Sequence, residues 1–344
     1  MLRFLSSLFA SPEEPRPDGL DEALVEKATE RLLEGTDPRI RALSDYRERL
    51  SEPVVQAILH VIALVDALPP PVAISPQAFG EDGGLRAFFV STEHLREVLG
   101  GFNTVREYLE NLAGPPPEDI FGLLTMLRQE RKVFGMELDG DTLRRDVLQV
   151  AVNFSSHRYH GIACTEADTR RELKKMAFDF LVQTTLQRLT DERSKRRELD
   201  RQRHLLRQKL DAMQAGQWGM NAMLGGGGQE APDLAQLEAE IEAIDAELGQ
   251  AHADKLSLED SLECITDTLN RPADWLASRE ISLRLDYRGV KIDDAAAAAA
   301  AGREITLTEL FSSTGEHRTV LLGRIARADL PEPPDFWKVA KRYL

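Results

Sequence analysis

The sequence predicts a mainly α-helical protein with a small α+β part, and three patterns carry that prediction. Apolar residues recur at a 3-4 helical spacing on both sides of the glycines at 225–228. Capped amphipathic stretches fill the chain up to residue 131, and short alternating apolar runs flank the glycine-centred region. These patterns predict an N-terminal helical bundle, a small β-containing head, and a long antiparallel coiled-coil hairpin inserted in the head.

The chain is divided by where these patterns change. The boundaries that we assign are 1–18 for a flexible or amphipathic tail, 19–131 for the α-helical bundle, 132–168 with 272–330 for the α+β head, 169–271 for the hairpin, and 331–344 for an aromatic and basic C-terminal tail.

The bundle is read from helix start and stop signals. Asp21 precedes the first helical stretch and Gly35 ends it, as an N-cap aspartate and a C-terminal glycine do. A second stretch runs from Ile40 to Leu68 and ends at three prolines, because proline cannot continue a helix. Further helices are expected at 92–99, 104–112 and 118–131.

Strand-type patterns begin at Val133 and return after the hairpin. An antiparallel hairpin brings its two ends together, so the strands on either side of it are expected to form one head. Two unrelated β-hairpins are the alternative. The expected strands are 133–138, 147–154, 159–164, 281–286, 290–292, 304–310 and 318–325, with a turn at 155–158.

The coiled-coil seam is specified pair by pair. Folding back at the glycines opposes Leu210 to Leu248, without any change of register along the hairpin. Residues 188–209 carry nine Lys/Arg against four acids, and residues 230–263 carry eleven acids against one Lys, which favours this pairing. Burial of the seam must supply most of the stability, because an exposed ion pair contributes only about 0.2–1 kcal/mol. The other expected pairs are Leu224–Leu234, Met213–Ile244, Leu199–Leu258 and Leu189–Leu269.

Charged residues interrupt the seam near its base. Glu192, Arg196 and Arg203 occupy seam positions, and Arg203 is expected to face Lys255. Either these long side chains reach out to water, or a third element or a partner covers the stripe at this level. The candidate partner-binding residues are therefore Leu258, Leu262 and Ile265 on this stripe, Trp218 near the hairpin tip, and Phe336 and Trp337 in the C-terminal tail.

Composition narrows the classes of function. The formal net charge of −15 argues against general nucleic-acid binding, and two cysteines fit a reducing compartment. No apolar run approaches the roughly 20 residues of a membrane span. The apolar N-terminal decapeptide is expected to pack on the protein, to stay disordered, or to touch a membrane surface.

No catalytic, cofactor or metal motif stands out. His157, His160, Cys164 and Glu166 form the one group of metal-ligand type, but on a strand His160 and Cys164 lie about 13 Å apart, too far for one ion. The Asp139–Thr142 segment reads as a β-turn.

We therefore expect no cofactor, no metal and no catalytic residues. The sequence favours a cytoplasmic structural or adaptor protein, whose coiled-coil arm contacts a protein partner or a second copy. One alternative is an enzyme with a site between bundle and head, with candidates Asp141, His157, Arg158 and His160. The other is a peripheral membrane protein that uses its amphipathic termini.

Overall fold

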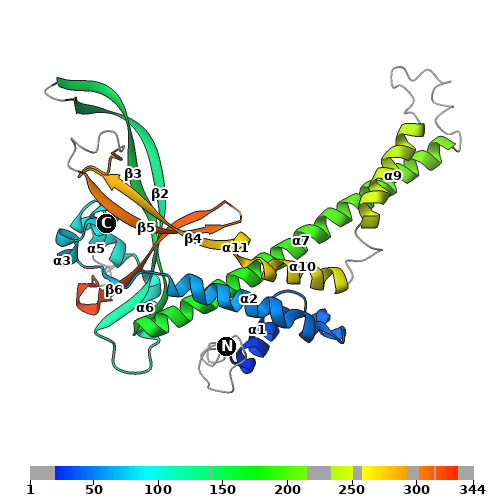
Figure 1. Cartoon of the computed structure of the whole chain (residues 1–344), viewed down its shortest axis with the longest axis horizontal. Coiled ribbons are helices and arrows are strands. Elements are labelled where there is room, and N and C mark those ends of the chain that lie inside the picture. Colours follow the sequence, from blue (N-terminus) through cyan, green and yellow to red (C-terminus); the bar gives the residue numbers. More distant parts are fainter. Residues whose placement is uncertain are drawn as a thin grey trace, which may run out of the picture. The chain divides into compact units, whose positions relative to one another are not determined.

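The computed structural model describes residues 20–139, 142–214, 234–250, 258–292, 302–313 and 315–331 (Figure 1). The chain divides into two compact units, and each unit is made of two chain segments. The first unit comprises Met1–Gln56 and Phe180–Arg271, and the second comprises Ala57–Asp179 and Pro272–Leu344. The five-part division assigned from the sequence stays a prediction.

The first unit is helical in the part of it that the structure describes. Asp21 caps α1 by accepting a hydrogen bond from Ala23 N (3.0 Å), and Asp37 caps η2 through Arg39 N (3.1 Å), so two carboxylates fix two helix starts. The helical elements are α1 (Glu22–Gly35), η2 (Pro38–Ala42), the start of α2 (Tyr46–Asp66), α7 (Glu166–Gln214) from Phe180 on, α9 (Leu234–Gln250) and α10 (Leu258–Asn270).

The base of the helical hairpin contacts η2 and α2. α10 contacts η2, and Arg193 of α7 reaches Asp37 at 2.5 Å, while Arg49 of α2 pairs with Glu259. The arginines at Arg39 and Arg193 hold the pKa of the nearly buried Asp37 carboxyl near 2, Arg39 contributing most. The fully buried apolar side chains of this base are Leu32, Leu33, Ile40, Leu50, Leu189, Leu262, Ile265 and Leu269.

The predicted register of the hairpin is wrong towards its tip. Near the base, Arg188 donates to Asp267 (3.1 Å) and Thr268 (2.6 Å). Further out, Arg203 and Arg207 both bind Asp245, at 3.3 and 2.8 Å, whereas Arg203 was expected to face Lys255. Arg207 was expected opposite residue 250 or 251, so these two contacts lie about five and ten residues from the expected positions, or roughly 8–15 Å of helix. One uniform register cannot satisfy both sets of contacts. Lys255 and the tip residues 215–233 lie outside the described part of the chain.

The second unit is organised by a six-stranded sheet. Its main path runs in the order β3-β2-β6-β5-β4 with antiparallel neighbours, and β1 adds to β6 in parallel. β2 pairs with β6 only from Asp119 to Met126, and beyond that point it pairs with β3 alone. The strands are β1 (Val72–Ala73), β2 (Asp119–Asp139), β3 (Thr142–Ala163), β4 (Leu276–Leu285), β5 (Arg303–Ser312) and β6 (His317–Ala326).

The two edges of the sheet meet at one level. Ala151 of β3 forms a bridge with Val290, just after β4, and Leu285 bridges Lys291. Val152 N donates to Gly289 O and Lys291 N donates to Val150 O, both at 2.8 Å. Gly289 has a φ of +78°, which a residue without Cβ adopts most easily. The contact closes the sheet locally, as in the mouth of a small barrel.

Short helices cover one face of this sheet and share its core. Leu85, Phe88, Leu95 and Leu99 pack with sheet residues such as Leu307 in one apolar cluster. The helical elements of this unit that precede β2 are α3 (Pro76–Glu81), α4 (Gly83–Phe88), α5 (Thr92–Gly100) and α6 (Asn103–Glu110); α11 (Pro272–Trp275) and η3 (Arg327–Asp329) lie near its C-terminal strands.

The predicted fold class needs correction. We expected a mainly α protein whose N-terminal bundle reaches residue 131 and whose β head is small, but a six-stranded sheet built from residues 72 to 326 organises the second unit. The stretch 118–131 is rich in Leu, Met, Gln, Glu and Arg and reads as helix, yet it lies in β2. Its long ladder with β3 overrides that helix propensity. The turn expected at 155–158 is also wrong, because β3 continues through it.

Among the described helices, none has the length and apolarity that crossing a bilayer requires.

Candidate functional site: a β-ribbon and two cavities of the sheet unit

The predicted partner-binding residues divide into two groups. Leu262 and Ile265 are fully buried within the chain, and Leu258 is half-buried at the start of α10. The chain itself therefore covers the part of the stripe formed by Leu262 and Ile265. Trp218, Phe336 and Trp337 lie outside the described residues, as do both amphipathic termini.

The candidate catalytic histidines do not converge. His157 and His160 are three residues apart on β3, which places them on opposite faces of the strand. His157 Nε2 donates to Phe88 O (3.0 Å), and its ring stacks on Phe89 with centroids 4.9 Å apart. The described residues contain no cluster of three or more His, Cys, Asp or Glu side chains that could hold a metal ion. Asp141 lies outside the described residues.

The environment of both histidines favours the neutral imidazole. Burial lowers the pKa of His157, and the nearby His94 adds to that lowering. Burial also lowers the pKa of His160, with further contributions from the positive charges of Arg158 and Arg318. Both rings are therefore expected to be uncharged at pH 7.

A two-stranded ribbon exposes apolar side chains. We call the part of β2 and β3 beyond Met126 the β-ribbon (Figure 1). Phe134 and Leu148 are directly opposite each other in its ladder and are 77% and 55% exposed. Val133 is also exposed. Nearer the sheet, β3 also bonds to the Gly289 turn, but Phe134 and Leu148 lie beyond that contact, where β2 and β3 pair only with each other among the described residues.

A buried ion pair ties the base of the ribbon to the sheet. Arg128 of β2 donates from Nε to Oε1 of Glu309 on β5 at 2.6 Å, and Glu309 is fully buried. Arg128 also pairs with the more exposed Glu130. The other Glu309 oxygen receives no hydrogen bond from the described residues and lies 3.8 Å from Arg279. Arg128 is therefore the main partner of a carboxylate that water does not reach.

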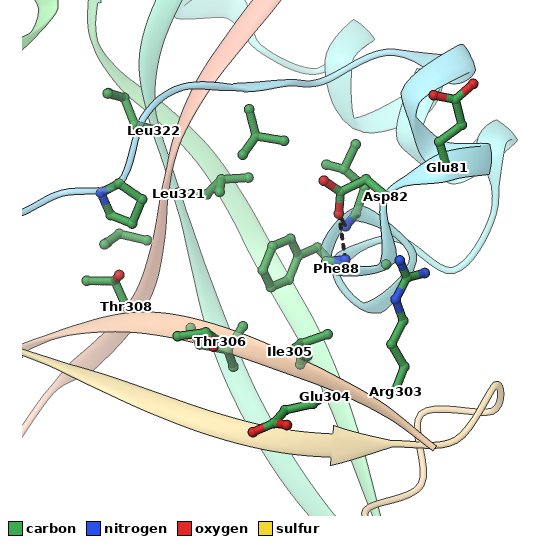
Figure 2. A pocket seen from close by; sticks show the side chains of 17 residues that line it. Glu81, Asp82, Phe88, Arg303, Glu304, Ile305, Thr306, Thr308, Leu321 and Leu322 are labelled. Carbon is green, nitrogen blue, oxygen red and sulfur yellow. Dashed lines mark hydrogen bonds between the residues drawn. The ribbon is translucent and has the colours of Figure 1, made fainter. Parts of the chain in front are cut away.

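The first cavity lies between α4 and strands β5 and β6 (Figure 2). Its volume is about 510 Å³, and Phe88, Ile305 and Leu321 lie around its middle. Asp82 sits at its rim, but its Oδ1 already accepts from Gly84 N (2.6 Å) and Leu85 N (3.2 Å) as the cap of α4. The cavity thus has apolar side chains around its middle and charged residues among its lining, namely Glu81, Asp82, Arg303 and Glu304.

The second cavity adjoins the first at Gly83, Arg303 and Ile305 and has a volume of about 660 Å³. It opens where the two edges of the sheet meet, beside the turn that contains Gly289. Among the described residues that line it, the charged ones are Arg86, Arg288, Arg303 and Asp286.

Sequence patterns did not predict these features. The strand prediction at 133–138 includes Phe134, but strand pattern alone does not show whether a face is covered. Gly83 and Arg303 are far apart in the sequence, and no local motif connects them.

Comparisons with protein-family models, with curated proteins and with solved structures found no match. No related protein therefore indicates what these surfaces bind.

Proposed function

We propose that this chain is a non-catalytic structural or adaptor protein that contacts a protein partner through its projecting antiparallel elements. The exposed pair Phe134 and Leu148 on the β-ribbon carries the proposal. Exposed apolar side chains of this kind stabilise a complex when a partner buries them. Each square ångström of apolar surface removed from water contributes about 25 cal/mol to the free energy of binding.

The backbone of the ribbon supports the same proposal. Beyond Met126, the outer edge of β2 has no partner strand among the described residues. An unpaired strand edge can accept an extended segment of another protein, and side chains on its face then add specificity. The ion pair of Arg128 and Glu309 connects the base of the ribbon to β5, so the ribbon begins at a defined position on the sheet.

The helical hairpin is the second contact element of the proposal. Leu205 on α7 is 57% exposed, and the flanking charges of the two arms differ in sign along the hairpin. A reducing, cytoplasmic setting belongs to the same proposal, because Cys164 and Cys264 are free thiols.

Site-specific photo-crosslinking in the cells that produce the protein tests the proposal. A photoreactive phenylalanine analogue is placed at Phe134, at Leu148 or at Arg131, which lies on the opposite face of the ribbon. We expect the first two positions to give the same adduct with another protein, Arg131 to give none, and Leu148→Ser to remove the adduct at position 134. Equal labelling from Arg131, or no protein adduct from either apolar position, would contradict the proposal.

A further inference from the structure

We propose that the second cavity binds a small organic anion, with its carboxylate or phosphate group held by Arg86 and Arg303 and its apolar body on the cavity floor. This site is separate from the β-ribbon face of the adaptor proposal.

The charges around the cavity are unbalanced. Asp286 is the one acid among the lining residues that the structure describes, and that carboxylate is occupied. Its Oδ1 accepts from the backbone N–H groups of Arg288 and Val290, both at 2.8 Å, and its Oδ2 lies 3.0 Å from Arg288 Nε. Arg86 and Arg303 have no acidic partner among the described residues. Two positive charges at one cavity therefore remain available for an anion.

The Arg303 side chain lies against a glycine. A Cβ atom on Gly83 would lie 2.1 Å from Nε and 2.2 Å from Cζ of Arg303, so the guanidinium packs directly on the Gly83 backbone. Figure 2 shows the Arg303 side chain extending from the start of β5 towards α4. Arg303 is an exposed residue, and its guanidinium lies at the cavity where a ligand can reach it.

The floor of the cavity determines the rest of the ligand. Phe89, Val152, Leu285 and Ile305 line the cavity and are all buried members of the sheet core. The volume of about 660 Å³ lies in the range of roughly 300–1,000 Å³ that small-molecule sites occupy. A hydrated inorganic ion would not cover this floor, whereas an anion with a hydrocarbon body would cover it and meet the arginines together.

Isothermal titration calorimetry with eight-carbon probes tests both halves of the proposal. Octyl phosphate and octanoate are expected to saturate one site on the full chain, while octylammonium and inorganic phosphate are not. Arg303→Gln and Arg86→Gln are each expected to weaken octyl phosphate binding about ten- to a hundredfold, the worth of a hydrogen bond to a charged group.

Two further variants separate a built site from general charge attraction. Gly83→Ala keeps every charge but displaces the Arg303 guanidinium, so it is expected to weaken binding as Arg303→Gln does. Arg96→Gln, on the exposed surface of α5, is expected to leave binding unchanged. Thermal unfolding of each variant shows whether it is folded. Arg86 and Arg303 are both exposed, so their variants are the ones to read if Gly83→Ala unfolds.

The outcomes that overturn the proposal are specific. They are the absence of saturable binding by octyl phosphate and octanoate, octylammonium binding as tightly as octyl phosphate, inorganic phosphate binding as tightly as octyl phosphate, or an effect of Arg96→Gln equal to that of Arg303→Gln.

Discussion

The helical hairpin and the β-ribbon are both long antiparallel pairs, but apolar residues at the base of the hairpin are buried and an apolar pair on the ribbon is exposed. In the hairpin, Leu262, Ile265 and Leu269 are fully buried, while in the ribbon Phe134 and Leu148 stand in water. A helix gathers its apolar residues on one stripe, so two helices and a third layer can cover them. At Phe134 and Leu148 the two-stranded ribbon has no covering layer among the described residues, and this exposed pair is the surface that the adaptor proposal uses.

Breaking the ribbon's anchor is expected to give the largest effect. Arg128→Met removes the main partner of the fully buried Glu309 and is expected to cost about 3–5 kcal/mol, because a buried charge is left without compensation. Urea unfolding followed by hydrogen exchange within the sheet measures the loss.

The double variant Arg128→Met/Glu309→Met is the control for that prediction, since it removes both charges together. It is expected to recover most of the lost stability. If the double variant were as unstable as the single one, side-chain packing and not charge would hold the base of the ribbon.

Truncating the base of the helical hairpin is expected to rank second. Leu262→Ala removes a fully buried side chain between α10 and its neighbours and is expected to cost about 3 kcal/mol through lost burial and a cavity. Leu205→Ala, at a position that is 57% exposed on α7, is the matched control and is expected to change stability by less than about 0.5 kcal/mol. Chemical denaturation of the first unit's helices, followed by circular dichroism, compares the two; equal losses would show that the hairpin lacks a packed base.

The same contrast explains how far the sequence predicts the structure. The first helix is confirmed from Asp21 to Gly35, because its cap and its apolar stripe lie within one short window. Residues 118–131 are predicted as helix and form a strand, because the residues that decide their state lie on β3 and β6, far along the chain. The register of the hairpin is wrong towards its tip for a related reason: a repeating apolar pattern fits several alignments, and the ion pairs to Asp245 select one.

The candidate sites were harder to predict than the fold. Burial of Leu262 and Ile265 depends on η2, a short element whose approach no periodicity shows. The cavity with Arg86 and Arg303 depends on the meeting of two sheet edges at Ala151 and Val290. Local patterns cannot encode either arrangement.

Acid is expected to weaken the sheet unit before it weakens the hairpin base. Burial lowers the folded-state pKa of His157 and His160 below the ordinary value of 6.5, so the unfolded chain binds more protons just below that pH. The two neutral histidines contribute their full stabilisation of the folded state above pH 6.5. This stabilisation is lost as the pH falls from 6.5 through their folded-state pKa values. The hairpin base depends on Asp37, whose pKa near 2 makes its contribution disappear only between about pH 4 and pH 2.

Urea midpoints at pH 7.5 and 5.5 measure this difference. The variant His157→Gln/His160→Gln is expected to lose less stability over that interval than the parent protein, since neither position can then take up a proton. An unchanged loss in the double variant would assign the acid sensitivity to other groups.

Substitution of the ribbon's exposed pair is expected to change stability least. A small effect would separate this pair from the buried residues of the hairpin base. Phe134→Ser at a position that is 77% exposed is expected to change the free energy of unfolding by less than about 0.5 kcal/mol, while it removes the partner adduct formed from position 148. Leu262→Ala is expected to lower stability strongly. A Phe134→Ser variant that unfolds like Leu262→Ala would mean that the ribbon's apolar pair serves the fold. A variant that stays folded and loses its partner would mean that the pair serves contact with the partner, because an exposed phenylalanine that does not stabilise the fold is explained by an interaction surface.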